Sequence, residues 1–128
     1  MSGVVVDTSV WIEYFAGRPA SGLEEALAHG LVVLPPLVVA ELISGAWRPR
    51  DQEAMTDLVQ EIPLHETPVT HWIRVGELRR YLKDKGVSVS TPDAHVAQCA
   101  LDREALLLSR DAVFDRIARV SALRVRPG

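Results

Sequence analysis

Four carboxylates lie far apart in the chain, each where an apolar segment meets a turn or a helix start: Asp7, Glu41, Asp93 and Asp111. A carboxylate at the edge of a core must be paired, protonated or bound to a cation, because burying an unpaired charge costs several kcal/mol. The chain has no set of Cys or His at ligand spacing, and oxygen ligands suit a hard cation such as Mg²⁺, for which Mn²⁺ can substitute. If the fold brings the four side chains together, they form a metal site.

Such a site favours chemistry on a phosphodiester. Mg²⁺ keeps several waters and typically takes one or two protein carboxylates together with substrate phosphate oxygens. One ion can polarise the phosphoryl group and generate hydroxide from water, and a second ion, roughly 3.5–4 Å away, could stabilise the leaving oxygen. The expected reaction is therefore hydrolysis by metal-activated water.

Two of the acids follow predicted strands. Residues 3–6 form a short apolar run that ends in Asp7, and residues 105–108 form another shortly before Asp111. Such runs, bounded by polar residues, are typical of buried strands. Further strands are expected at 31–34 and 123–126, with a short edge strand at 62–65.

Helices are expected between these strands, at segments that begin with capping residues or prolines. They are predicted from Thr8 or Ser9 to Phe15, from a Ser21–Glu24 capping box to Gly30, at about 37–47, from an Asp51 cap to about 60, from Thr67-Pro68 to near 86, at 93–103 after Thr91-Pro92, and at 111–119. Alternating strands and helices predict an α/β sandwich with a mainly parallel central sheet, in one domain spanning 1–128. Ligands bind such sheets beyond the carboxyl ends of the strands.

The other two acids are predicted to lie on helices. Residues at offsets of three, four, seven and eight from Asp93 are apolar, so Asp93 heads a buried stripe, whereas His95, Gln98 and Asp102 share the opposite face. Glu41 is surrounded by apolar residues and is expected at the edge of the core. Taken singly, each of the four acids could be a cap, a turn residue, a dipole partner or half of a salt bridge. Their agreement in one architecture favours a common site.

Composition limits the class of protein. With 128 residues, 48% of them hydrophobic, the chain can bury one core. The single cysteine, Cys99, excludes an internal disulfide and favours a reducing compartment, the cytoplasm. The N-terminus does not resemble a signal peptide, and the longest apolar stretch, 31–40, is too short to span a bilayer. No membrane role is expected.

Charge is unevenly distributed. The formal net charge of −3 gives no global positive field. Residues 74–85, however, carry five basic and two acidic side chains, which predicts a local basic face. Arg79 and Lys83, one helical turn apart, and Arg110, beside Asp111, are the candidate phosphate contacts. An ordinary solvated face is the alternative for all three.

The remaining reactive or aromatic residues point less clearly to function. The four histidines show no ligand spacing, so neither a metal nor a catalytic role is expected for them. Cys99 is predicted to be a small buried hydrophobe. The aromatic side chains could line a groove for a partner helix or pack in the core, and both interpretations stay open: Trp11, Tyr14, Phe15 and Trp47.

The segments VVVDTSVWIEYF, VVAELISGA, TPDAHVAQCAL and LLLSRDAVF contain the four acids in turn. As a set they resemble PIN-domain ribonucleases, and within these the VapC toxins of bacterial toxin–antitoxin pairs, over nearly the whole chain. The resemblance implies a PIN-like three-layer sandwich and a metal-dependent endoribonuclease. It also implies a cognate VapB-like antitoxin, whose C-terminal tail wraps the toxin and obstructs the acidic site, and a homodimer within that complex.

The resemblance assigns roles at matching positions. Asp7, Glu41, Asp93 and Asp111 match the acidic positions of the family, while Thr8 or Ser9 and Ser109 match its hydroxyl positions near the metal. The chain departs from the family pattern after Asp111. Many relatives carry another acid two residues later, where this chain has Val113, and its next acid, Asp115, is predicted to face solvent.

Two other functions are compatible with the pattern. One is a PIN nuclease that acts in RNA maturation without an antitoxin. The other is a non-enzymatic domain, either a degenerate PIN scaffold or a signalling receiver. A receiver needs a lysine after a late strand, whereas the two lysines of this chain, Lys83 and Lys85, fall on a predicted helix. The sequence does not identify the RNA.

Overall fold

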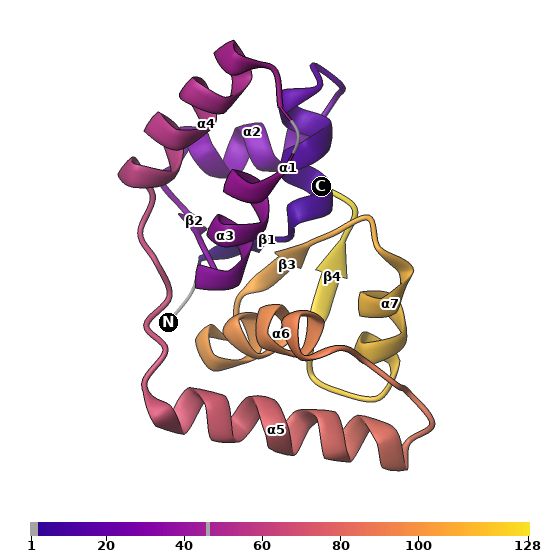
Figure 1. The fold of residues 1–128 in the computed structure, drawn as a ribbon. Coiled ribbons are helices and arrows are strands. Elements are labelled where there is room, and N and C mark those ends of the chain that lie inside the picture. Colours follow the sequence, from indigo (N-terminus) through magenta and orange to yellow (C-terminus); the bar gives the residue numbers. More distant parts are fainter. Residues whose placement is uncertain (1–2, 46) are drawn as a thin grey trace.

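A four-stranded, fully parallel sheet forms the centre of the molecule (Figure 1). The computed structural model describes residues 3–45 and 47–128. The strands are β1 (Val4–Val6), β2 (Val32–Val33), β3 (Leu106–Leu108) and β4 (Arg124–Arg126). Their order is β2-β1-β3-β4, so the direction of winding reverses between β1 and β3. This confirms the predicted α/β fold, and a ligand site is expected at that reversal.

Seven helices flank the sheet in the described part of the chain. They are α1 (Thr8–Phe15), α2 (Ser21–Ala28), α3 (Pro36–Ser44), α4 (Pro49–Glu61), α5 (Val69–Asp84), α6 (Thr91–Arg103) and α7 (Ala112–Arg119). Helix α6 packs on β1 and β3, and α5 lies along the outer side of α6 (Figure 1). Helix α6 is therefore covered on two sides. None of the helices described is both long and apolar enough to cross a membrane.

The strands form because their apolar side chains are buried. Val5 and Leu107 pair in register and are fully buried, as is Val6, and Leu108 is nearly so. Near-continuous apolar runs are characteristic of parallel strands covered by helices. The edge strand predicted at 62–65 is wrong, since Leu64 makes only a single parallel bridge to Leu34.

Several predicted helix starts are also wrong. Neither Thr8 nor Ser9 caps α1, because Asp7 holds that position. Helix α2 begins at Ser21 without a capping box. Helix α4 starts at Pro49, ahead of Asp51, whose carboxylate instead accepts from the Arg48 guanidinium at 2.8 Å. The fixed backbone angle of proline suits the first helical turn and moved this start upstream.

The two Thr-Pro pairs also differ from expectation. Helix α5 begins at Val69, after Pro68, so Thr67 is not its cap. Helix α6 already includes Thr91, and the Ser90 hydroxyl caps it by accepting from the Asp93 amide at 3.2 Å. This cap places Asp93 in the first turn of α6, where the sequence predicted it.

The aromatic residues of α1 pack rather than line an open groove. Trp11 is fully buried, stacks on Phe15 with ring centroids 6.1 Å apart, and meets Tyr14 edge-on. Phe15 in turn contacts Trp47, whose indole N–H donates to the Leu42 carbonyl at 2.7 Å. Helix α3 ends at Ser44, so Trp47 lies beyond the helix predicted to contain it. Core packing is confirmed for Trp11, whereas Tyr14, Phe15 and Trp47 are half-buried against the core.

Candidate metal centre

Asp7 is the most constrained of the four acids. It follows β1, is only 8% exposed, and its amide donates to the Leu108 carbonyl of β3 at 2.9 Å. Its Oδ2 accepts from the hydroxyls of Ser9 at 2.8 Å and Ser109 at 3.0 Å, and from the Ser9 amide at 3.4 Å. No hydrogen bond among the residues described uses Oδ1. The carboxylate is therefore held through one oxygen while the other stays available.

The two serine hydroxyls join the start of α1 to the loop that follows β3. Ser9 Oγ accepts from the Arg110 amide at 3.0 Å, and Ser109 Oγ accepts from the Asp111 amide at 3.1 Å. Asp111 itself caps α7, because its Oδ1 accepts from the Val113 amide at 3.0 Å. The sheet reversal thus brings Asp7 and Asp111 to neighbouring loops, as predicted from their positions after strands.

Glu41 lies in a different environment from the one expected. It is exposed on α3, so the argument that its burial requires a cation is wrong. Its Oε1 accepts from the Thr8 hydroxyl at 2.9 Å, which links α3 to the start of α1 beside Asp7. Helix α3 buries Val38 and Leu42 instead, leaving Glu41 on the open side. Glu41 still faces the residues after β1.

Asp93 is half-buried at the start of α6. Burial is the largest cause that raises the pKa of its carboxyl above the ordinary value, and the Ser90 hydroxyl partly opposes this. The charges of Asp111 and Asp7 raise the pKa further. The Asp93 carboxyl therefore lies within reach of the charges of Asp7 and Asp111.

The protein supplies little positive charge to this centre. Among the residues described, no Arg, Lys or His forms an ion pair with any of the four acids. Nor do three of the four bring ligand oxygens within 4.8 Å of one another in the described structure. An all-oxygen, uncompensated and open donor set fits Mg²⁺, which takes few protein ligands and keeps water.

Asp115, on α7, is exposed, as predicted. Its side chain makes no hydrogen bond or ion pair within the described part of the chain.

The three cationic candidates are placed differently. Arg110 donates to the carbonyls of Pro127 at 3.0 Å and Pro19 at 2.8 Å, so its guanidinium already ties the chain end to the loop after α1. Arg79 donates to the Val89 carbonyl at 3.1 Å. Arg79 and Lys83 line a shallow recess at the end of α5. Of the three, Arg110 is the least free to meet a phosphate.

A second polar centre, which was not predicted from the sequence, lies between α5 and α6. Asp102 accepts from Arg74 at 2.8 and 3.0 Å and from Gln98 at 2.8 Å. It also lies 2.9 Å from His71 Nδ1 and 3.3 Å from His65 Nε2. Burial opposes ionisation of Asp102, but these hydrogen bonds together hold the pKa of its carboxyl well below the ordinary value. A carboxylate with this many donors is a structural anchor.

The hydrogen bonds continue from Asp102 to a buried histidine pair. Because ionised Asp102 can only accept, His71 Nδ1 carries the proton, and its Nε2 accepts from His95 Nδ1 at 2.9 Å. The available signal was the polar face of α6, on which His95, Gln98 and Asp102 recur at helical spacing. That face is buried because α5 covers it.

Stability should fall as pH drops below about 6.5. Burial lowers the pKa of His95 to about 4 from the ordinary 6.5, helped by charge on His71 and His65. Below pH 6.5 the unfolded chain binds a proton at His95, whereas the native chain does not. This difference lowers the free energy of unfolding by roughly 3 kcal/mol between pH 6.5 and 4. Urea unfolding across this range measures the loss. His95→Gln should flatten the profile, whereas the exposed control His29→Gln should not, and a flat native profile contradicts the assignment.

The chain is similar to known proteins in both sequence and fold. The PIN domain family model matches residues 4–120. Ribonuclease VapC11 of Mycobacterium tuberculosis is 27% identical over 129 residues, covering 94% of this chain and 96% of the relative. VapBC2 from Rickettsia felis, bound to a DNA fragment from their promoter, superposes with a TM-score of 0.74, 19% identity and 98% coverage of both chains. VapBC-1 from nontypeable Haemophilus influenzae gives 0.74, 21% identity and coverage of 98% and 97%. At these identities the two structures establish the fold alone.

Proposed function

The chain belongs to the PIN-domain family, and on that basis we propose that it is a metal-dependent endoribonuclease, the toxin of a VapBC-type toxin–antitoxin pair. One observation carries the enzymatic part of the proposal. Asp7, nearly buried and held by two serine hydroxyls, lies beside two further aspartates without a cationic partner in the described structure. The relative named ribonuclease VapC11 aligns over almost the whole chain.

The acidic centre would hold Mg²⁺, or Mn²⁺ in its place, through Asp7, Asp93 and Asp111, with Glu41 at its open side. When bound, the cation polarises the phosphoryl group and lowers the pKa of attacking water. Ser9 and Ser109 keep Asp7 in one orientation, so its free Oδ1 needs no rearrangement. This preorganisation lowers the cost of assembling the site.

Glu41 orients the attacking water in this proposal. The Thr8 hydroxyl holds Oε1, which leaves Oε2 to accept a hydrogen bond from water on the open side of the centre. The water attacks phosphorus in line with the leaving oxygen. The exposed position of Glu41 then has a function, because a water-binding carboxylate must be reachable from solvent.

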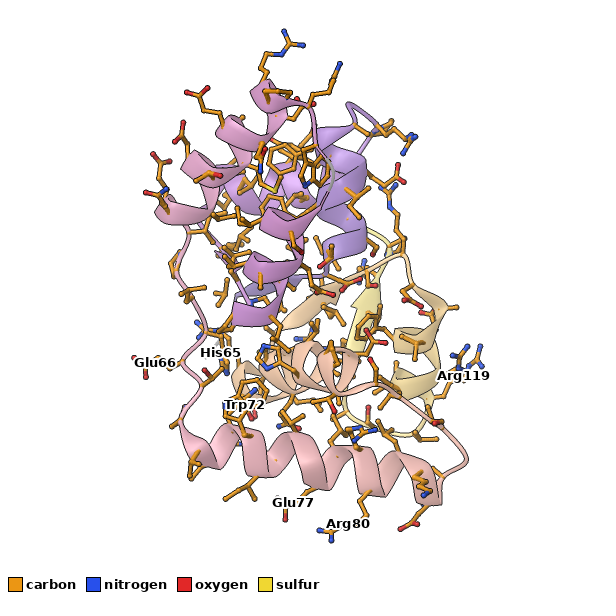
Figure 2. All side chains as sticks on the ribbon, in the orientation of Figure 1. His65, Glu66, Trp72, Glu77, Arg80 and Arg119 are labelled. Atoms are coloured by element: carbon orange, nitrogen blue, oxygen red, sulfur yellow. The ribbon has the colours of Figure 1, made fainter. Side chains whose placement is uncertain are left out.

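Lys83 and Arg79 are proposed to contact the RNA backbone. Lys83→Ala should weaken RNA binding by about threefold to tenfold, leave turnover at saturating RNA unchanged, and reduce the salt dependence by about one phosphate contact. Filter binding at several salt concentrations measures both effects. The matched control is Arg119→Ala, which removes a charge that projects outward from α7 (Figure 2). Equal effects of the two variants contradict a specific contact.

We also propose a cognate VapB-like antitoxin, a homodimer within that complex, and a cytoplasmic location. The structures of similar fold named above are described as VapBC, which supports an antitoxin partner. Val69, Trp72 and Ile73 are exposed apolar residues at one end of α5 and offer a surface for a protein partner. The alternative, an RNA-maturation nuclease without an antitoxin, predicts no small DNA-binding antitoxin gene next to this one.

The test combines purified protein with cells. RNA should be cut with Mg²⁺ or Mn²⁺ and left intact with a chelator, and induced expression should arrest growth. Coexpressing the neighbouring small gene should restore growth, and RNA ends mapped after brief induction should identify the substrate. Cleavage that persists with chelator contradicts the metal-dependent mechanism. Cleavage without growth arrest instead favours the maturation nuclease.

A further inference from the structure

A second set of metal-ligand side chains lies away from the acidic centre. His65, His71 and Cys99 each present a ligand atom within 4.8 Å of the others, and all three are buried. Over the described part of the chain, no other group of His, Cys, Asp or Glu comes as close. The donors are nitrogen and sulfur, whereas the acidic centre offers only oxygen. The two sets therefore suit different cations.

His65 provides an independent sign of a ligand. It belongs to the segment between α4 and α5, where its amide donates to the Leu34 carbonyl at 2.8 Å. Its ring is 8% exposed and turned toward α6, while the adjacent Glu66 points outward (Figure 2). The ring's Nδ1 is buried without a hydrogen-bond partner in the described structure. Such an orphaned nitrogen is costly, and the Asp102 network leaves it unexplained.

We propose that His65, His71 and Cys99 bind Zn²⁺. Neutral imidazole and thiolate are the preferred zinc ligands. Asp102 fixes the proton of His71 on Nδ1 and so presents Nε2 as the ligand, an arrangement common behind metal-bound histidines. His71 then gives up its hydrogen bond with His95, whose ring lies 3.8 Å from the Cys99 sulfur and can take the fourth position.

An aromatic ring covers part of this site. The Trp72 ring stacks on His95 at 4.7 Å with an interplanar angle of 9°, and Figure 2 places Trp72 between α5 and α6. Burial raises the pKa of the Cys99 thiol far above its ordinary value, so the sulfur carries a proton before the ion binds. Binding forms the Zn–S bond and releases that proton to solvent.

The proposal also assigns the ion a structural role. His65 precedes α5, His71 lies on α5 and Cys99 lies on α6, so one ion would fasten three segments together. Helix α6 carries Asp93 of the acidic centre at its start. Zinc would stabilise the packing of α5 on α6, the helix that carries Asp93, without taking part in RNA cleavage.

Cobalt provides the test, because a Co²⁺–thiolate bond absorbs strongly in the near ultraviolet and tetrahedral Co²⁺ absorbs in the visible. The full chain carrying Asp7→Asn and Asp93→Asn, which disables the acidic centre, should bind one Co²⁺ with both signals. Zn²⁺ should displace it and raise Tm. Cys99→Ala and His65→Gln should each weaken Zn²⁺ binding about 10- to 100-fold, and His29→Gln should not.

Two outcomes overturn the proposal. One is Co²⁺ binding without the thiolate band. The other is Zn²⁺ binding that survives Cys99→Ala and His65→Gln undiminished. Circular dichroism of both variants establishes that they are folded, and His65→Gln alone decides the matter if Cys99→Ala unfolds the chain. Neither outcome bears on RNA cleavage, which depends on the separate acidic centre.

Discussion

Replacing Asp7 with Asn should reduce RNA cleavage by at least about 100-fold while leaving the protein folded. The substitution removes the negative charge nearest the sheet reversal, where a cation would be held. It preserves the fold because Asn is as good a helix cap as Asp and can still accept from the Ser9 amide. Initial cleavage rates at saturating Mg²⁺, with Tm measured on the same samples, give the result.

Asp93→Asn provides a second test of the same centre. Cleavage should fall to a similar extent, but stability should hold or rise slightly, because burial and the neighbouring aspartates already disfavour the charge on Asp93. Asp115→Asn is the matched control, since it removes an exposed carboxylate on α7 and should leave cleavage unchanged. Undiminished cleavage by both Asp7→Asn and Asp93→Asn contradicts the proposed centre.

Asp102→Ala should be the most destabilising single change at the second polar centre. It leaves the donors of Arg74, Gln98, His71 and His65 without their shared acceptor. Removing one partner from a fully buried ionic network costs about 3–5 kcal/mol, and because Asp102 is half-buried and Arg74 is exposed we expect the low end, about 3 kcal/mol. For a chain of this size that corresponds to a fall in Tm of more than about 10 °C. Thermal and urea unfolding of the purified variant measure the effect.

The control for this prediction is Asp57→Ala. Asp57 is an exposed aspartate on α4, and its replacement should change stability by no more than about 0.5 kcal/mol. Asp102→Asn keeps an acceptor oxygen but loses the charge, so it should fall between the two. If Asp102→Ala is as stable as Asp57→Ala in thermal and urea unfolding, the network contributes little to stability and α5 is held by apolar contacts alone.

Much of the acidic centre was predictable because it depends on local pattern. Asp7 and Asp111 follow short apolar runs, and parallel strands end at one edge of a sheet whatever the loops between them do. Asp93 heads an apolar helical stripe, so its place at the start of α6 also follows from spacing. Glu41 was predicted in the centre for the wrong reason, because apolar sequence neighbours do not establish which helix face is buried.

Helix starts were less predictable. Ser21 and Asp51 have side chains that can cap, yet Ala20 and Arg48 hold the cap positions of α2 and α4. A cap contributes only about 1 kcal/mol, so packing and a nearby proline readily move a helix start by a few residues. The predicted positions of the four acids do not depend on this uncertainty. A shift of a helix start by a few residues changes which side chain caps the helix, but it moves each side chain little.

The sequence alone determined the alternation of strands and helices, the parallel sheet, and the positions of Asp7 and Asp111 after strands and of Asp93 at a helix start. These features depend on side-chain periodicity and on residues adjacent to strands. Only the tertiary structure decided that α5 covers the polar face of α6, which buries His71 and His95 and leaves Asp102 half-buried beside them. Whether a polar helix face meets water or another helix depends on the path of a distant segment. No local pattern in α6 carries that information.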